Sequence, residues 1–232
     1  MTRLLVFSKT TGFRHDSIEP GVAALESLTS ADGLAVDATE DASAFTAENL
    51  ARYGSVVFLS SSGEVFDDRQ RAALQAYVLG GGGYVGIHAA STTEYDWPFY
   101  GELAGARFDG HPEVQQATMT VHDHDHPATA HLDRTWVWTD EWYNVRDGPR
   151  LGAHTLLSVD ESTYTGGTMG AEHPIAWCHH VGDGRCFYTA LGHPAEAYTE
   201  PTFQAHLLGG IRWVLRSDAE SGVPSPHVSR RP

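Results

Sequence analysis

Cysteine, positive charge and long apolar runs are all scarce in this sequence of 232 residues. Its 2 cysteines, Cys178 and Cys186, are too few for a disulfide scaffold and lack the paired spacing of a structural zinc site, so we expect buried thiols. No apolar run reaches about 18 residues, and no basic leader precedes an apolar segment. These absences argue against a membrane or secreted protein and predict a cytoplasmic one.

The shortage of positive charge also excludes partners. The sequence has 15 Lys and Arg against 30 Asp and Glu, a formal net charge of −15. Such a surface repels nucleic acid phosphates and anionic lipids, so we expect neither nucleic acid nor a membrane as partner. The 14 histidines and 6 tryptophans instead indicate a polar pocket with aromatic faces that suit a small sugar.

Strand-like and helix-like patterns alternate in the first part of the chain. Short apolar runs predict strands, and segments with helical spacing or helix-capping residues predict helices. The predicted strands cover residues 3–8, 33–39, 54–60 and 84–88, and the predicted helices cover residues 17–30, 46–52 and 67–81. This order predicts an α/β fold, in which helices cover both faces of a parallel sheet and ligands bind outside the carboxyl ends of its strands.

From about residue 113 the pattern changes to strands without intervening helices. These strands are predicted over residues 113–122, 134–139 and 154–159, followed by a hairpin over residues 173–191 that turns at its glycines. A last helix is predicted over residues 201–216. We therefore expect one domain over residues 1–216 and a C-terminal tail over residues 217–232, which has little to bury.

The segment from Gly86 to Ala90 has the form of a strand that runs into a sharp turn. Many α/β enzymes mount a nucleophile on such a turn, which needs small residues two before and two after its apex. Gly86 and Ala90 meet that need, but the apex is His88, whose imidazole can act as a base or as a metal ligand. The alternative interpretation is that His88 is an ordinary hydrogen-bonded residue at a strand end.

Other polar residues follow the predicted strands at the same edge of the sheet. Arg14, His15 and Asp16 come after the first strand, just before a helix, and His193 and Glu196 come after the last strand. Because the carboxyl ends of parallel strands meet at one edge, we expect these residues to converge on a crevice. Arg14 and His15 are expected to bind a polar ligand there.

Two further segments add candidates. Asp140 and Glu141 stand beside Trp142 and Tyr143, which suits a sugar, because its hydroxyl groups need acceptors and its C–H faces stack on rings. The alternative there is a strand edge with ordinary core aromatics. His111 is expected in a loop that can close over the crevice.

Two groups of histidines allow a simpler interpretation. His122, His124 and His126 alternate as metal ligands on one face of a strand would, but the segment is highly polar, and we favour a solvated loop. His179 and His180 are neighbours in the hairpin and should point to opposite faces, so at most one of them can belong to the site.

Six segments, taken in order, carry a resemblance to a known family. They are TGFRHDSI (11–18), GGGYVGIHAAS (81–91), Gly110 to Pro112, His126 to Pro127, Asp140 to Tyr143, and residues 173–193. Together they resemble the ThuA-like trehalose-utilisation family, over residues 3 to about 215. That family is related in fold to class I glutamine amidotransferases, so the resemblance implies a flavodoxin-like, doubly wound, mostly parallel sheet with added antiparallel strands.

The resemblance also implies that the catalytic cysteine of the amidotransferases is missing. The amidotransferases place a catalytic cysteine at the elbow and supply histidine and glutamate from a His-Pro-Glu segment near the end. Here His88 occupies the elbow, and the late segment runs from His193 to Glu196. Without the thiol a glutaminyl thioester cannot form, so glutamine hydrolysis by that route is excluded.

What the resemblance implies instead is chemistry on a keto sugar or keto glycoside, by isomerisation, hydrolysis or elimination. His88 or His193 would remove the proton α to the ketone, and the other imidazole would stabilise the enediolate oxygen. Alternatively, a divalent metal such as zinc, held by these two and by His111 or a carboxylate, would stabilise it. An oxidoreductase that forms keto sugars is the expected pathway partner.

The remaining candidates would assist. Glu141 or Asp140 would orient an imidazole or accept a hydroxyl, Arg14 and His15 would hold the polar edge of the sugar, and Trp142 and Tyr143 would stack on it. Two alternatives stay open, a non-catalytic sugar-binding or regulatory domain and hydrolysis through a serine. The serines in question are Ser60, Ser61, Ser62 and Ser91.

Overall fold

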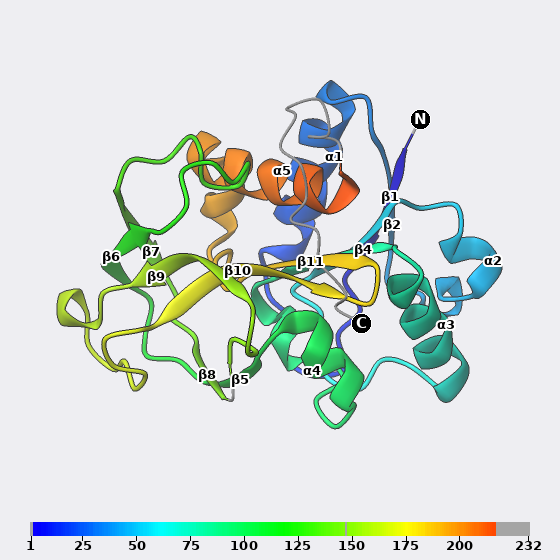
Figure 1. The fold of residues 1–232 in the computed structure, drawn as a ribbon, viewed down its shortest axis with the longest axis horizontal. Coiled ribbons are helices and arrows are strands. Elements are labelled where there is room, and N and C mark those ends of the chain that lie inside the picture. Colours follow the sequence, from blue (N-terminus) through cyan, green and yellow to red (C-terminus); the bar gives the residue numbers. More distant parts are fainter. Residues whose placement is uncertain (1, 147, 217–232) are drawn as a thin grey trace, which may run out of the picture.

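The structure is a computed structural model, and it describes residues 2–146 and 148–216. The predicted tail over residues 217–232 lies outside the described residues. The described part contains a nine-stranded sheet and a separate two-stranded sheet, with helices packed on both faces of the large one (Figure 1). None of the described helices is long and apolar enough to cross a bilayer.

One half of the large sheet is parallel. Its strands are, in spatial order, β2 (Ala35–Thr39), β1 (Arg3–Phe7), β3 (Ser55–Leu59), β4 (Gly83–Ile87) and β11 (Gly184–Thr189). Strands β3 and β4 are buried along their whole length, as expected where helices cover both faces of a parallel sheet. The predicted doubly wound α/β fold is confirmed.

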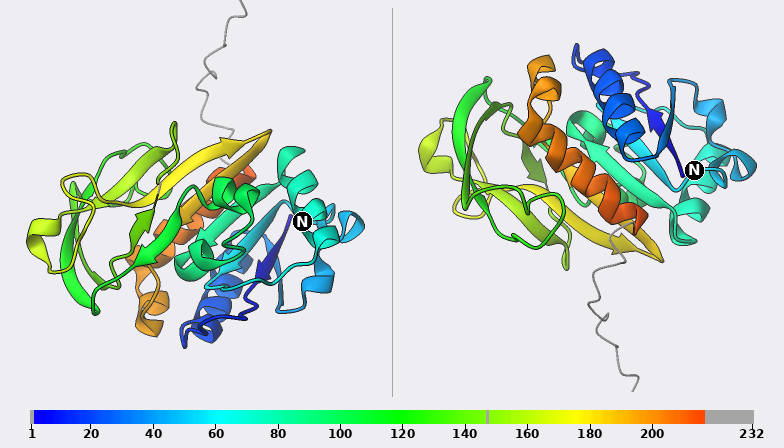
Figure 2. Two further views of the ribbon diagram at one scale, coloured as in Figure 1. Left: turned by 90° about the horizontal axis from the view of Figure 1, so that it is seen from below. Right: turned by 90° about the horizontal axis from the view of Figure 1, so that it is seen from above.

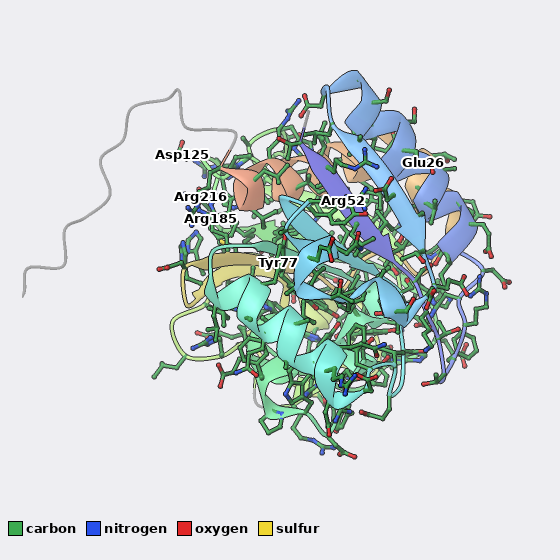
Figure 3. The ribbon with its side chains drawn as sticks, turned by 90° about the vertical axis from the view of Figure 1, so that its right-hand side faces the viewer. Glu26, Arg52, Tyr77, Asp125, Arg185 and Arg216 are labelled. Carbon is green, nitrogen blue, oxygen red and sulfur yellow. The ribbon has the colours of Figure 1, made fainter. Side chains whose placement is uncertain are left out.

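Helices cover the parallel half from both sides. Helices α1 (Ile18–Ala31) and α5 (Pro201–Leu215) lie on one face, α3 (Asp68–Leu79) and α4 (Pro98–Ala104) lie on the other, and α2 (Ala47–Leu50) packs against α3 (Figure 2). Figure 3, seen from the right-hand side of Figure 1, shows α1 and α3 flanking the parallel strands. The predicted start of α3 is confirmed, because Asp67 and Gln70 form a capping box that satisfies free N–H groups there.

Four antiparallel strands extend the sheet beyond β11. They are β10 (Pro174–Val181), β9 (His154–Val159), β6 (Gln115–Val121) and β7 (Thr135–Asp140), in that spatial order. Strands β10 and β11 form the predicted hairpin, which places β11 between β4 and the antiparallel half. Cys178 and Cys186 lie in this hairpin as buried free thiols, as expected, and burial raises the pKa of Cys178 to about 12.

Three short elements escaped prediction: helix α4 and the two strands of the small sheet, β5 (Arg107–Gly110) and β8 (Asn144–Arg146). Each spans too few residues to show a periodic pattern in the sequence. The small sheet positions the site nevertheless. Because β5 ends just before His111 and β8 begins just after Tyr143, their pairing brings two of the expected site segments together.

The ends of three central strands are level. Leu59 of β3 pairs with Ile87 of β4, and Ile87 pairs with Thr189 of β11. The next residue of each chain segment therefore leaves the sheet at the same edge. For β4 that residue is His88, and for β11 it is Ala190.

Candidate functional site

His88 occupies a strained turn directly after β4. Its backbone φ is 50°, in the left-handed region that side chains other than glycine rarely adopt, and a 3-10 helix (His88–Thr92) follows at once. Gly86 makes the approach possible, since a Cβ there would lie 2.8 Å from the Tyr84 hydroxyl and 2.9 Å from the Tyr188 ring. This local geometry is the predicted elbow.

The ring of His88 is fully buried, and its two nitrogens face different partners. Nδ1 lies 2.8 Å from the carbonyl oxygen of Ala190, an acceptor, so Nδ1 carries the proton and donates. In the neutral ring Nε2 then carries a lone pair and no proton. It faces the Tyr143 hydroxyl at 2.9 Å, which donates to it, and His15 Nε2 at 3.1 Å.

Glu141 joins three imidazoles at the same point. Its Oε2 lies 3.0 Å from His193 Nδ1 and 3.6 Å from His88 Nε2, and its Oε1 lies 3.3 Å from His111 Nδ1. Although Oε2 and His193 Nδ1 are close, they lack hydrogen-bond alignment, and Nδ1 has no hydrogen-bond partner among the residues that the structure describes. Both atoms point into the space shared with His88 and His15.

The electrostatics follow from this crowding. Burial alone would raise the pKa of the Glu141 carboxyl, but the neighbouring His193 and His88 rings hold that pKa well below its usual range. The same carboxylate raises the pKa of His193. Burial, together with the two neighbouring rings, lowers the pKa of His15 to about 3, so His15 is neutral at physiological pH.

Asp140 does not face the cluster, contrary to its expected role as an orienting or accepting group for imidazole or sugar. It is fully buried, and its two oxygens accept hydrogen bonds from the backbone N–H groups of Glu141, Gly192 and His193 and from the Trp138 indole. Because β7 is the far edge strand, this contact requires the antiparallel half to curl back toward the end of β11. Asp140 thus positions Glu141 and His193 through their backbone N–H groups and has no hydrogen bond to their side chains.

A cavity of about 640 Å³ opens over the cluster. Its polar lining includes His15, His111, Glu141 and His193, whereas His88 itself does not line it. Its walls are mainly aromatic and apolar, and a volume of this size holds a small organic ligand.

Three of the wall residues were not predicted. Phe13, Tyr95 and Phe108 line the cavity beside Tyr143, and Phe13 is 69% exposed at its mouth. Phe13 lies within the TGFRHDS segment, which was the one available signal. Tyr95 and Phe108 lie in the region of α4 and β5, where no pattern was recognised.

Two of the residues expected to contact a sugar, Trp142 and Arg14, do not line the cavity. The Trp142 ring is fully buried and its indole donates to the Gln115 carbonyl at 2.9 Å, so only Tyr143 of that aromatic pair faces the cavity. Arg14 does not line the cavity either, because it pairs with Glu19 and Glu40 at the surface beside α1.

The carboxylate beside His193 is Glu141, one of the two acids expected to orient an imidazole, and not the later Glu196. Glu196, which follows His193 as in the amidotransferase segment, is exposed and lines a separate hollow beside Trp138. Glu141 contacts His193 instead. Since Glu141 lies 52 positions before His193 in the sequence, spacing could not reveal this pairing.

The other histidines stay outside the site. His122 is exposed and His126 is buried, so they do not share one face, in line with the favoured loop, and His179 faces the carbonyl of Glu102. The neighbouring His180 is exposed, as expected if the two rings point to opposite faces.

Among residues 2–146 and 148–216, one group of side chains has metal-ligand spacing: His15, His88, Glu141 and His193. Of the three expected metal candidates, His111 is outside that group.

Three of the serines considered as nucleophiles are engaged elsewhere. Ser91 shares a hydrogen bond with the Tyr188 hydroxyl, Ser61 shares one with Thr93, and Ser62 donates to the carbonyl of Phe13. The cluster itself can move protons between imidazole, carboxylate and phenol, or it can hold a cation. Both abilities suit a ligand that carries a carbonyl or hydroxyl oxygen.

Comparison with known proteins agrees with this architecture. The model of the ThuA family, described as trehalose utilisation, matches residues 3–214. A ThuA-like protein from Bacteroides uniformis is 26% identical, with a TM-score of 0.79 over 92% of this chain and 91% of the other. One from Parabacteroides merdae is 22% identical, with a TM-score of 0.78 over 97% and 93%.

More distant similarity concerns the fold alone. A β-galactosidase from Rahnella sp. R3 is 15% identical, and the similarity covers 93% of this chain but 31% of that one, with a TM-score of 0.59. No curated protein matches the chain significantly.

Proposed function

The chain belongs to the ThuA family, which implies a role connected with carbohydrate, and from that premise we propose that it converts a keto sugar or keto glycoside. The observation that carries the proposal is the cluster of imidazoles around Glu141 at the floor of an aromatic-walled cavity. Sugar C–H faces pack on aromatic rings, and a ketone is the sugar group that makes the neighbouring C–H acidic enough for an imidazole base.

The base in this proposal is an imidazole held against Glu141. Two rings meet that condition and also line the cavity, His193 and His111. His88, the other ring expected to act as base, is fully buried and does not line the cavity, so His111 replaces it in the proposal. One of them takes the proton from the carbon α to the ketone, the C–H electron pair forms the C=C bond of the enediolate, and the carbonyl electron pair moves to oxygen. The oxygen then faces the buried side of the cluster, where His15 and the Tyr143 hydroxyl lie.

Return of the proton to the former carbonyl carbon, with transfer of the neighbouring hydroxyl proton to the enediolate oxygen, gives isomerisation. In elimination, the enediolate re-forms the ketone, the bond from the adjacent carbon to the glycosidic oxygen breaks, and the protonated imidazole gives its proton to that oxygen; addition of water then completes hydrolysis. Glutamine hydrolysis is not proposed, because both cysteines are buried in the β10–β11 hairpin and the elbow carries His88. An oxidoreductase that converts a ring hydroxyl to a ketone would supply the substrate. The cytoplasmic location stays a prediction from the sequence.

The test is turnover of 3-ketotrehalose, with trehalose as the unoxidised comparison, followed by product analysis. His193→Ala and His111→Ala should each be assayed against His122→Ala, a matched control at an exposed histidine outside the cavity. Loss of the imidazole that acts as base should lower kcat by about 10²–10⁴-fold. The products distinguish isomerisation, hydrolysis and elimination.

Two results would contradict the proposal. One is turnover that both alanine variants leave unchanged. The other is tight binding of unmodified trehalose with no product from any keto sugar, which would identify a sugar-binding domain instead of an enzyme.

A further inference from the structure

Four side chains aim one ligand-type atom each at a common point. The atoms are His15 Nε2, His88 Nε2, Glu141 Oε2 and His193 Nδ1, and they all lie within 4.8 Å of one another. Ligand atoms bound to zinc at about 2.0–2.1 Å in a tetrahedron are about 3.3 Å apart. The three distances that join neighbouring atoms here, 3.0, 3.1 and 3.6 Å, bracket that value.

The orientation of one ring, that of His88, is fixed by a hydrogen bond on the side away from the common point. The Ala190 carbonyl accepts from His88 Nδ1, which leaves the Nε2 lone pair on the side of the common point, where the Tyr143 hydroxyl now donates to it and a cation would take its place. His111 Nδ1 lies 3.3 Å from the other oxygen of Glu141. Such outer contacts from a carbonyl or a second polar group are typical of metal ligands, because they set the tautomer and the ring angle.

Hydrogen bonds account for only part of the cluster: the Tyr143 hydroxyl donates to His88 Nε2, but two of the imidazole nitrogens have no partner among the described residues. The facing nitrogens of His15 and His88 can share only one proton, and His193 Nδ1 and Glu141 Oε2 are close but not aligned. His15 Nδ1 is buried and has no hydrogen-bond partner in the part of the chain that the structure describes.

From this convergence we infer that His15, His88, Glu141 and His193 form a binding site for one divalent transition-metal ion. Three neutral imidazoles and one carboxylate suit Zn²⁺, and also Mn²⁺, Co²⁺ or Fe²⁺, better than Mg²⁺ or Ca²⁺, which prefer oxygen ligands. His193 is partly exposed to the cavity, so the ion would be open to a water or a substrate oxygen on that side.

The metal site deepens the proposed function, on which its catalytic meaning rests. A cation at the cluster would polarise the sugar ketone and hold the enediolate oxygen. His193 would then be a ligand and could not serve as base. The proton would pass to His111, the remaining cavity imidazole against Glu141, so the C–H bond breaks as an N–H bond forms on His111.

The decisive experiment measures metal binding without any sugar. Protein stripped with a chelator is titrated separately with Zn²⁺, Mn²⁺ and Mg²⁺ by calorimetry, and Co²⁺ binding is followed by visible absorption. We expect one Zn²⁺ per chain, weak or absent Mg²⁺ binding, and a higher Tm for the Zn²⁺ form, because the ion binds the folded state. Glu141→Gln and His193→Ala should each weaken Zn²⁺ binding by at least about 100-fold.

Two control variants separate the possibilities. His122→Ala should bind Zn²⁺ like the wild type, and His111→Ala should keep one ion per chain while losing sugar turnover. Circular dichroism and Tm without metal confirm that each variant is folded. The inference is overturned if the folded wild type binds none of the transition metals at about 0.1 mM, or if both ligand variants bind Zn²⁺ as the wild type does. Stoichiometric metal with no turnover of any keto sugar would instead contradict the proposed function alone.

Discussion

At the scale of single residues, the backbone of His88 adopts a strained conformation that its neighbours hold in place. A non-glycine residue at positive φ costs on the order of 1–3 kcal/mol and persists only where its surroundings fix it. Here the Tyr188 hydroxyl donates to the His88 carbonyl at 2.8 Å, and the Ala190 carbonyl accepts from its ring. His88 is therefore held by Tyr188 of β11 and by Ala190 directly after that strand, which are 100 and 102 positions away in the sequence.

Asp140 gives a residue-scale prediction. In Asp140→Asn an NH₂ group replaces one of the two oxygens that accept hydrogen bonds from Gly192, His193, Glu141 and Trp138, so buried donors lose their acceptor. The free energy of unfolding should fall by about 1–3 kcal/mol for each unsatisfied donor. The measurement is Tm by circular dichroism, with exposed Asp16→Asn as the control. An unchanged Tm would show that Asp140 does not hold this loop.

Sequence predicted some of these residues and not others for a physical reason. The elbow at His88 was predictable because its small neighbours are adjacent in the chain. The contact of His193 with Glu141 in particular was not predictable, because it depends on how the antiparallel half of the sheet bends back toward the end of β11. For the same reason the sequence could not tell that Tyr143 faces the cavity while Trp142 faces the core.

At the scale of elements, helix α5 shows how closely a helix can approach the sheet. A Cβ on Gly209 would lie 2.2 Å from the Pro127 carbonyl oxygen, and one on Gly210 would lie 2.4 Å from the Phe187 ring of β11. Glycine normally weakens a helix by about 1 kcal/mol relative to alanine. These two glycines therefore serve packing rather than helix formation.

Gly209→Ala tests this interpretation. The gain in helix propensity should be outweighed by overpacking against backbone, with a net loss of about 1–3 kcal/mol in the free energy of unfolding. In a chain of this size that lowers Tm by about 2–4 °C per kcal/mol. Arg69→Ala, on the exposed face of α3, is the control and should leave Tm nearly unchanged. A more stable Gly209→Ala variant would refute the close approach.

Most of the longer elements were predicted, together with the short helix α2, which follows the capping residue Thr46. Helices α1, α3 and α5 and the strands of the large sheet carry enough residues to show their period. Helix α4 and strands β5 and β8 are short and depend on contacts with residues distant in the sequence, so their own residues show no recognisable pattern.

At the scale of the whole molecule, buried neutral histidines make the fold sensitive to acid. Burial lowers the pKa of His206 to about 3 and that of His179 to about 4. His206 Nδ1 donates to the Ala128 carbonyl, and its Nε2 accepts from Thr189. Neither ring can take a proton in the folded state at pH values where it does so in the unfolded chain.

The sign follows directly. Above the unfolded pKa of about 6.5 neither state binds the proton, so these histidines do not change the free energy of unfolding. As pH falls from about 6.5 toward 4, the unfolded state gains protons that the folded state does not. The free energy of unfolding then falls by up to about 1.4 kcal/mol per pH unit for each histidine. Urea unfolding between pH 4 and 7 measures this. His206→Asn, which can still donate to Ala128, should show a shallower decline. An equally steep decline in that variant would exclude His206 as a cause.

The position of β11 has a consequence for how the protein is made. Strand β4 leaves the ribosome long before β11, the partner that covers its open edge and supplies the carbonyl that orients His88. Until the hairpin is synthesised, that edge exposes unpaired backbone groups on a very hydrophobic strand, a state that favours association between nascent chains. Synthesis of the β10–β11 hairpin, late in translation, is therefore the step that both completes the site and covers the exposed edge of β4.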